Sequence, residues 1–157
     1  MAADTERIDL HPAGENSLEL LIPMVAAAHR LENIERTDGE RREAVLPLLG
    51  DSSLGRIWVI GVDGHTAGYA ALCFGYSIEF GGRDAFVDEL YLTDAFRGRG
   101  IGAIVLERLV EAAAALGIRA LHLEVNRGNE RAVRLYRRWG FTERSASMLM
   151  SRPIPRN

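Results

Sequence analysis

The chain has 157 residues, of which 47% are hydrophobic, and a formal net charge of −3. This length and composition predict one globular domain over residues 1–157, and the charge argues against nucleic acid as a partner. The chain contains no lysine, which excludes a Walker-type phosphate site, Schiff-base chemistry and a pyridoxal site.

Other classes are excluded by the cysteine, the histidines and the apolar runs. A single cysteine cannot form an internal disulfide, and four widely spaced histidines predict no metal site. No apolar run approaches the length that a bilayer crossing needs, and the N-terminal residues do not resemble a signal peptide. We therefore expect a cytoplasmic protein with no membrane partner.

Hydrophobic periodicity near the start of the chain predicts one strand and two helices. The expected elements are a strand over 8–11, a helix over 15–29, a polar and acidic loop over 31–40, and a second helix over 41–49. Pro23 lies inside the first helix and is expected to kink or split it.

A β-meander follows, with strands over 56–62, 66–76 and 85–92. Asp63-Gly64 and Gly81-Gly82 are the turn signals between them. Neighbouring strands joined by such tight turns are antiparallel.

The last part of the chain alternates helices and strands. The expected elements are a helix over 101–116, a strand over 120–125, a helix over 129–139, and a last strand or pair of strands over 141–151. Because a helical crossover joins two parallel strands, the strand over 120–125 should run parallel to the strand over 85–92.

The segment between the meander and the next helix is rich in arginine and glycine. Its residues are Arg97, Gly98, Arg99, Gly100, Ile101 and Gly102. A helix start carries unpaired N–H groups and a partial positive charge, and glycines let an anion approach them closely. With two arginines beside it, this helix start predicts a seat for a phosphate or a pyrophosphate.

Two kinds of anion-binding loop fit this segment. Gly98-x-Gly100-x-x-Ala103 matches the dinucleotide fingerprint, and Glu124 follows at roughly the expected distance. The order of elements argues against it, because a dinucleotide domain opens with its glycine loop and continues with parallel strands. The alternative, Arg97-x-x-Gly100-x-Gly102, resembles the coenzyme A pyrophosphate loop of the GCN5-related N-acetyltransferase (GNAT) superfamily, whose pattern is Gln/Arg-x-x-Gly-x-Gly/Ala.

A second motif supports the GNAT resemblance. The segment 121–141 resembles the superfamily's C-terminal motif through Leu123-x-Val125, Asn126-x-x-Asn129, Ala132, Leu135-Tyr136 and Gly140-Phe141. Together the two motifs cover about residues 85–141 in the family's order and at its usual separation. The segment 88–92 also resembles the one that precedes the loop in the family.

The resemblance implies an α/β (α+β) GNAT fold: a mixed, mostly antiparallel sheet flanked by helices, whose fourth and fifth strands splay apart to admit the coenzyme. It also implies an N-acetyltransferase in which a primary amine attacks acetyl-CoA directly, without an acyl-enzyme and without a metal. A homodimer is expected because the family often forms one. The acceptor stays open between a small amine, such as a polyamine, an amino acid or an aminoglycoside, and a protein N-terminus.

The resemblance also assigns residues to the coenzyme. Backbone N–H groups of the Arg/Gly loop would hold the pyrophosphate, with Arg97 at the motif's basic position and Arg99 either helping or solvated. Tyr91 and Leu92 would offer backbone N–H groups to the thioester carbonyl and the pantetheine amides. Asn129 would hydrogen-bond the pantetheine arm, or serve only as a helix N-cap.

Tyr136 matches the family's general acid, which returns a proton to the departing thiolate; the alternative is an aromatic residue of the core. The base that deprotonates the amine is open between Asp88, Glu89 and Glu124. Because Asp88 and Glu89 alternate along a strand, only one is expected to face a given side. Asp88 aligns with the glutamate of diamine acetyltransferases and Glu124 with that of acetyltransferases of protein N-termini, although each could be a sheet carboxylate paired with arginine.

Two other functions stay open at this point. A non-catalytic acyl-CoA sensor on the same fold would bind the coenzyme without turnover, and an NAD(P)-binding oxidoreductase would need an all-parallel sheet. The acidic residues between the first two helices could attract a polyamine or simply form a solvated loop; they are Glu32, Glu35, Asp38 and Glu40.

Overall fold

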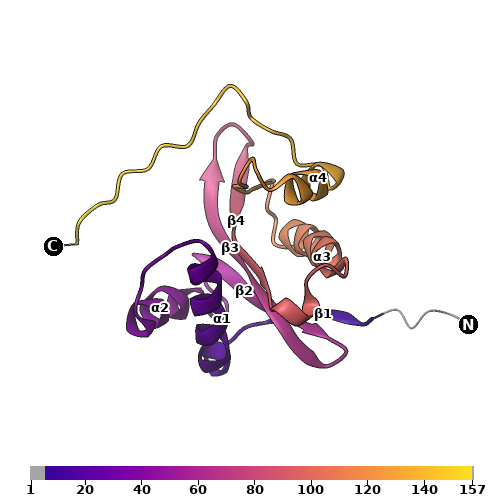
Figure 1. Ribbon diagram of the computed structural model, residues 1–157. Coiled ribbons are helices and arrows are strands. Elements are labelled where there is room, and N and C mark those ends of the chain that lie inside the picture. Colours follow the sequence, from indigo (N-terminus) through magenta and orange to yellow (C-terminus); the bar gives the residue numbers. More distant parts are fainter. Residues whose placement is uncertain (1–5, 157) are drawn as a thin grey trace, which may run out of the picture. The chain divides into compact units, whose positions relative to one another are not determined.

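The computed structural model describes residues 6–156, and this part of the chain divides into two compact units, one up to Glu124 and one from Val125 onward. The strands of the first unit are β1 Ile8–Pro12, β2 Gly55–Val62, β3 His65–Ser77, β4 Gly82–Leu92 and β5 Ala120–His122 (Figure 1). Its helices are α1 Leu18–Leu31, α2 Asp38–Val45 and α3 Ile101–Ala115, with short 3-10 turns at Glu15–Ser17, Leu46–Leu48 and Asp94–Phe96. The second unit contains α4, Glu130–Arg138.

The five strands form one sheet in the order β1-β2-β3-β4-β5. The pairs β1–β2, β2–β3 and β3–β4 are antiparallel, whereas β4–β5 is parallel. The mixed, mostly antiparallel sheet with flanking helices is therefore confirmed. This sheet also argues against the dinucleotide-binding alternative, which requires parallel strands throughout.

Helices cover both faces of the sheet, and each face has its own hydrophobic core. The α3 face packs against α3 and includes Trp58, Ile60, Leu72, Ile101, Val105 and Leu109. The α1–α2 face packs against α1 and α2 and includes Leu21, Ile22, Val25, Val45, Ile57 and Tyr69. Side chains of a strand alternate between the two faces, so the continuous apolar run of β2 fills both cores.

A β-bulge interrupts β4 at Asp88. Leu72 of β3 pairs with Val87 and the next residue back, Ala71, pairs with Glu89, so Asp88 is an extra residue on β4. Val87 packs on the α3 face, whereas Glu89 contacts Tyr69 of the α1–α2 face. The Asp88 carboxylate lies near enough to the Cys73 thiol to raise its pKa, and Cys73 alternates with Leu72 of the α3 core. The bulge therefore places Asp88 and Glu89 on the same face, and the prediction that only one of them faces a given side is wrong.

The pairing of β4 with β5 is short. It covers three residue pairs and ends at Phe86 and His122, while β4 continues to Leu92. The strand expected over 120–125 thus ends at His122. Bulges increase local twist, and the pairing stops just before the bulge at Asp88. The edge of β4 from Val87 onward has no partner strand among residues 6–156, as expected for splayed fourth and fifth strands.

Two helix predictions need correction. Helix α2 begins at Asp38 rather than 41, because Thr37 and Glu40 form a capping box: Thr37 Oγ1 accepts the Glu40 N–H, and Glu40 accepts the Thr37 N–H. Helix α1 runs without interruption through Pro23, so this proline does not split the helix. Proline removes only one intrahelical hydrogen bond there, and the packing of α1 on the sheet compensates for that loss.

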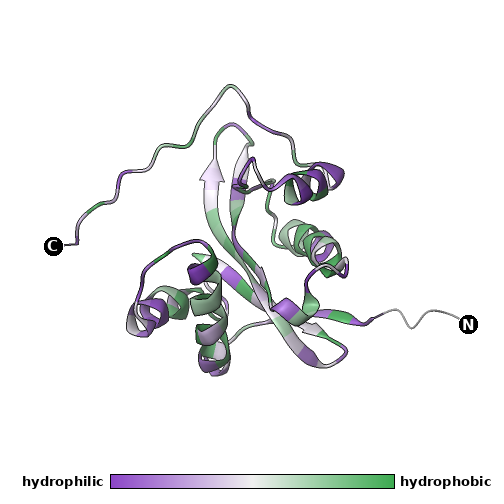
Figure 2. Cartoon of the chain, in the orientation of Figure 1, coloured by the Kyte–Doolittle hydropathy of each residue, from purple (hydrophilic) through white to green (hydrophobic). Residues whose placement is uncertain are grey.

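The second unit is built around α4, which is largely hydrophilic in Figure 2, whereas α3 is largely hydrophobic. Asn129 caps α4, its side chain accepting the Ala132 N–H at 3.2 Å. After α4, Phe141 N–H donates to the Tyr136 carbonyl, and Gly140 takes the left-handed conformation that ends a helix.

The strand predicted over 141–151 is wrong: residues 141–156 contain no strand in the described chain. Met148 and Met150 there are more than 80% exposed, so the alternation of apolar residues in this segment has no core to face. Within residues 6–156, no helix combines the length and the apolar character needed to cross a membrane.

Candidate active site

The N-terminus of α3 has the features of an anion-binding site. Gly98 and Gly100 adopt left-handed conformations, with φ values of 71° and 78°. Gly100 is the N-cap of α3 and provides no side-chain hydrogen bond, so the first N–H groups of α3 are left for a ligand. A Cβ atom at Gly100 or at Gly102 would meet nothing within 4 Å, so the space around this helix start is open.

The two loop arginines hold the loop in place. Arg97 Nε donates to the Leu92 carbonyl at 2.8 Å, and its guanidinium also pairs with Asp94 and lies over the Tyr91 ring. Arg99 pairs with Glu6 and donates to the Ala95 carbonyl at 3.2 Å. Arg97 therefore ties the glycine loop to the end of β4, and each of the two guanidinium groups beside the helix start is paired with a carboxylate.

The end of β4 presents backbone donors at its open edge. Thr93 N–H donates to the Ala67 carbonyl of the β3 segment at 2.8 Å. Because hydrogen-bonding directions alternate along an antiparallel strand, Leu92 N–H points away from β3, toward the open edge, whereas Tyr91 faces β3. β3 comes so close here that a Cβ at Gly68 would lie 1.9 Å from the Tyr91 carbonyl oxygen. Only glycine at 68 lets the two strands pair at this point.

Glu89 is held by two donors. Tyr69 Oη donates to Glu89 Oε2 at 2.8 Å, and His29 Nε2 lies 3.0 Å from Oε1. Burial, followed by the charge of Glu89, raises the pKa of the Tyr69 phenol, so Tyr69 keeps its proton and donates it. No site role for His29 or Tyr69 was predicted from the sequence, and the His29–Glu89 contact joins residues that lie 60 positions apart.

Asp88 is exposed and lies close to Cys73. Burial raises the pKa of the Cys73 thiol to about 11, and the charges of Asp88 and Glu89 add to this effect. A thiol with this pKa is protonated at neutral pH, so Cys73 is not an activated nucleophile. Glu124, the third candidate base, is exposed at the end of the first unit.

A second polar pair lies where β4 and β5 still pair. His122 Nε2 is 3.1 Å from Asp84 Oδ2, and the His122 ring packs against Phe80 and Phe86 with centroids 5.4 and 5.3 Å away. Phe86 alternates with the residues of the α3 core, so it lies on the α1–α2 face with Asp88. This part of the face therefore combines aromatic rings with carboxylates, a pairing that sequence analysis did not predict.

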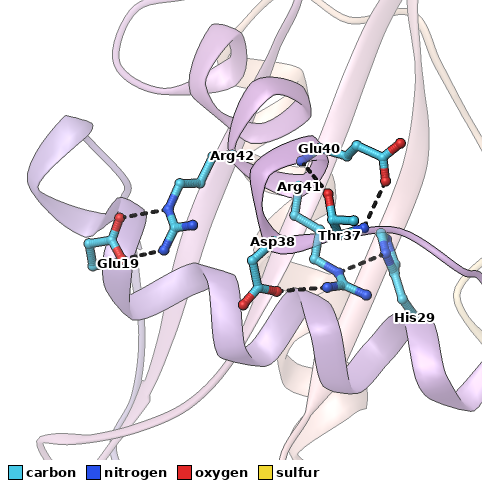
Figure 3. A network of polar contacts seen from close by, with 7 residues as sticks. All are labelled: Glu19, His29, Thr37, Asp38, Glu40, Arg41 and Arg42. Atoms are coloured by element: carbon cyan, nitrogen blue, oxygen red, sulfur yellow. Dashed lines mark hydrogen bonds and ion pairs between the residues drawn. The ribbon is translucent and has the colours of Figure 1, made fainter.

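The acidic segment before α2 has a structural role. Figure 3 shows Glu40 in the capping box with Thr37 and Asp38 paired with Arg41 at 2.7 Å. Two of the four acidic residues that could attract a polyamine, Asp38 and Glu40, thus stabilise α2 itself. Glu32 and Glu35 are exposed.

In the second unit, Tyr136 packs edge-on against Phe141, with ring centroids 5.9 Å apart. Burial raises the pKa of the Tyr136 phenol, so it carries its proton at neutral pH. Asn129 acts as the N-cap of α4, which was one of its two expected roles. Among the residues that the structure describes, no three His, Cys, Asp or Glu side chains gather as metal ligands would.

Known proteins that are similar to this chain include two acetyltransferases and one solved structure. Thialysine N-epsilon-acetyltransferase of Bos taurus is 34% identical over 73 residues, which are 46% of this chain and 42% of that protein. Streptothricin acetyltransferase of Streptomyces lavendulae is 31% identical over 93 residues, or 59% of this chain and 47% of that protein. The solved structure of integron cassette protein HFX_CASS3, from the metagenome of Cole Harbour salt marsh, is similar with a TM-score of 0.80 and 29% identity, covering 94% of this chain and 91% of its own.

The chain spans less than half the length of the two acetyltransferases named above. The acetyltransferase (GNAT) family model, by contrast, matches residues 24–141, which include the α3 loop, β4 with its bulge and the C-terminal motif. The chain therefore belongs to the acetyltransferase (GNAT) family.

Proposed function

We propose that this chain is an acetyl-CoA-dependent N-acetyltransferase, which moves acetyl to a primary amine by direct attack. The observation that carries the proposal is the uncapped start of α3, which follows two left-handed glycines and is tied by Arg97 to the open end of β4. An anion seat and a free strand edge side by side suit a ligand with a diphosphate at one end and amide groups along its arm. Membership of the GNAT family supports coenzyme A as that ligand.

The coenzyme would be held mainly by backbone groups. N–H groups of the segment 98–102 would bind the pyrophosphate, with the charges of Arg97 and Arg99 beside it. Leu92 N–H, aimed at the open edge, would donate to an arm amide or to the thioester carbonyl, where it would stabilise the developing oxyanion. Tyr91 N–H faces β3 instead, so the Tyr91 backbone would not donate to the coenzyme. The side-chain NH2 group of Asn129 would hydrogen-bond the pantetheine arm while its oxygen caps α4.

Acetyl transfer requires that one proton is removed from the amine and that one is given to the departing thiolate. The amine nitrogen attacks the thioester carbonyl carbon, the carbon–sulfur bond breaks, and the sulfur leaves as a thiolate. Tyr136, whose phenol is protonated at neutral pH, would give its proton to that sulfur. The proton lost by the amine would go to Asp88 or Glu124, directly or through water. Glu89 is a weaker candidate, since both its oxygens already accept hydrogen bonds.

The acceptor would lie on the α1–α2 face beside the bulge. Asp88 and Glu89 share this face with the exposed ring of Phe86, so a cationic amine with an apolar body fits its chemistry. The named relatives acetylate thialysine and streptothricin, both of which carry primary amines. These two compounds therefore lead the panel of acceptors to test.

The test has two stages. Isothermal titration with coenzyme A comes first, and no binding at high micromolar concentrations would end the proposal. Release of free thiol from acetyl-CoA is then measured with thialysine, streptothricin, spermidine, an aminoglycoside, free amino acids and peptides with a free N-terminus. Binding without transfer to any of these amines would instead favour an acyl-CoA sensor.

A further inference from the structure

A chain of hydrogen bonds runs from α2 through α1 to β4. Asp38 pairs with Arg41 at 2.7 Å, Arg41 Nε donates to His29 Nδ1 at 3.4 Å, and His29 Nε2 lies 3.0 Å from Glu89 Oε1. Tyr69 completes the chain at the other carboxylate oxygen of Glu89. Figure 3 shows its first part, in which Arg41 reaches from α2 to His29 on α1.

The order of donors and acceptors fixes the proton on His29. Arginine has only donors and stays charged, so His29 Nδ1 must be the acceptor of the Arg41 N–H. The ring proton then sits on Nε2 and is donated to Glu89. One tautomer of a neutral imidazole thus satisfies both neighbours, and Glu89 receives one hydrogen bond at each oxygen.

This chain of hydrogen bonds is more buried than the other polar contact between α1 and α2. The side chains of His29 and Arg41 are 15% and 10% exposed. The neighbouring ion pair of Arg42 with Glu19 has exposed fractions of 43% and 71%, so it lies in solvent and does not reach β4. The Glu89 side chain is 26% exposed and shares the α1–α2 face with Asp88, so it remains accessible to a ligand.

We infer that His29 and Arg41 are positioning residues, which fix the Glu89 carboxylate in one orientation on the α1–α2 face. Through Glu89, they affect the rate at which an acceptor amine on this face is acetylated. The inference rests on the proposed function, because an acceptor amine must meet this face. His29 acts through Glu89, and Arg41 acts through His29 by holding its tautomer. Both residues belong to the helices that cover the face of the sheet opposite α3, so coenzyme binding should not depend on them.

Kinetics with acetyl-CoA and thialysine test the role in the reaction. His29→Leu and Arg41→Leu should each lower kcat/KM for the amine by about tenfold or more, the usual effect of losing a residue that orients a functional group. His29→Gln should recover much of the loss, since a glutamine amide can donate to Glu89 and accept from Arg41. Arg42→Ala is the matched control: it removes an α1–α2 ion pair and should leave kcat/KM and the affinity for coenzyme A unchanged.

Nuclear magnetic resonance tests the hydrogen bonds without an acceptor. In the wild type and in Arg42→Ala, the ¹⁵N shifts of His29 should show a protonated Nε2 and an unprotonated Nδ1; Arg41→Leu should lose that preference. If thialysine is not acetylated, the kinetics are measured instead with an amine of the panel that is acetylated.

The inference is overturned if Arg41→Leu and Arg42→Ala behave alike in either experiment, or if His29→Leu retains full activity while folded. It is also overturned if His29→Gln is as inactive as His29→Leu at equal Tm. Loss of coenzyme A binding in the wild type would be a different result, because that would refute the proposed function itself.

Discussion

Alanine at Gly100 and alanine at Gly102 make a matched pair, because the same methyl group enters two positions of one loop. Gly100 has φ 78° and ψ 3° in the left-handed region, where a residue with a Cβ costs about 1 kcal/mol. Gly102 is the second residue of α3, where alanine in place of glycine gains up to about 1 kcal/mol. In a chain of this size, 1 kcal/mol shifts Tm by roughly 2–4 °C. We therefore expect Gly100→Ala to lower Tm and Gly102→Ala to raise it.

Binding of coenzyme A should separate the two variants further. A methyl group on Gly100 stands beside the first free N–H groups of α3, so the Kd should rise at least about tenfold, which is about 1.4 kcal/mol at 25 °C. Gly102 occupies a position where the family's loop pattern accepts alanine, so Gly102→Ala should bind like the wild type. Thermal unfolding and isothermal titration on the same samples measure both quantities. If Gly100→Ala loses stability but binds coenzyme A normally, the anion does not rest on this helix start.

Three further outcomes are expected. Tyr136→Phe should bind coenzyme A normally and transfer acetyl about 100-fold more slowly, because a phenyl ring has no proton for the thiolate; an unchanged rate would show that another group supplies it. Thr37→Ala removes the acceptor of the Glu40 N–H and should lower the free energy of unfolding in urea by about 1 kcal/mol. The pKa of the Cys73 thiol is raised to about 11, chiefly by burial, so alkylation by iodoacetamide should be slow at neutral pH and accelerate as pH rises toward 11. Reaction at neutral pH as fast as with free cysteine would contradict that burial.

The arrangement of the sheet could be predicted because its signals are local. Asp63-Gly64 and the glycine pair at 81–82 mark turns, and the crossover through α3 dictates a parallel β5. The capping box at Thr37 and Glu40 was also present in the sequence, as a Thr-x-x-Glu pattern, and its omission gave the late start predicted for α2. The prediction of a last strand over 141–151 was wrong because alternating apolar residues form a strand only where they can pair with a neighbouring strand and pack against a core.

The candidate site was only partly predictable, for a different reason. The loop over 97–102 and the pair Leu135-Tyr136 are contiguous in sequence, so their spacing is visible. The bulge at Asp88 has no residue that marks it, since it arises from the register between β3 and β4. The contact of His29 with Glu89 joins residues that only the packing of α1 on the sheet brings together. Long-range polar contacts of this kind leave no periodic trace in a sequence.

Asp88 is the one residue of β4 that an uninterrupted ladder would not need. If it were deleted, Val87 would still point under α3 and Glu89 would still point toward Tyr69, so both cores would survive. Without the bulge β4 would be less twisted, and its pairing with β5 could continue past Phe86. The open edge of β4, where the coenzyme arm is proposed to bind, would then be closed. The single extra residue Asp88 thus keeps the edge of β4 open, and its carboxylate is also a candidate to accept the proton of the attacking amine.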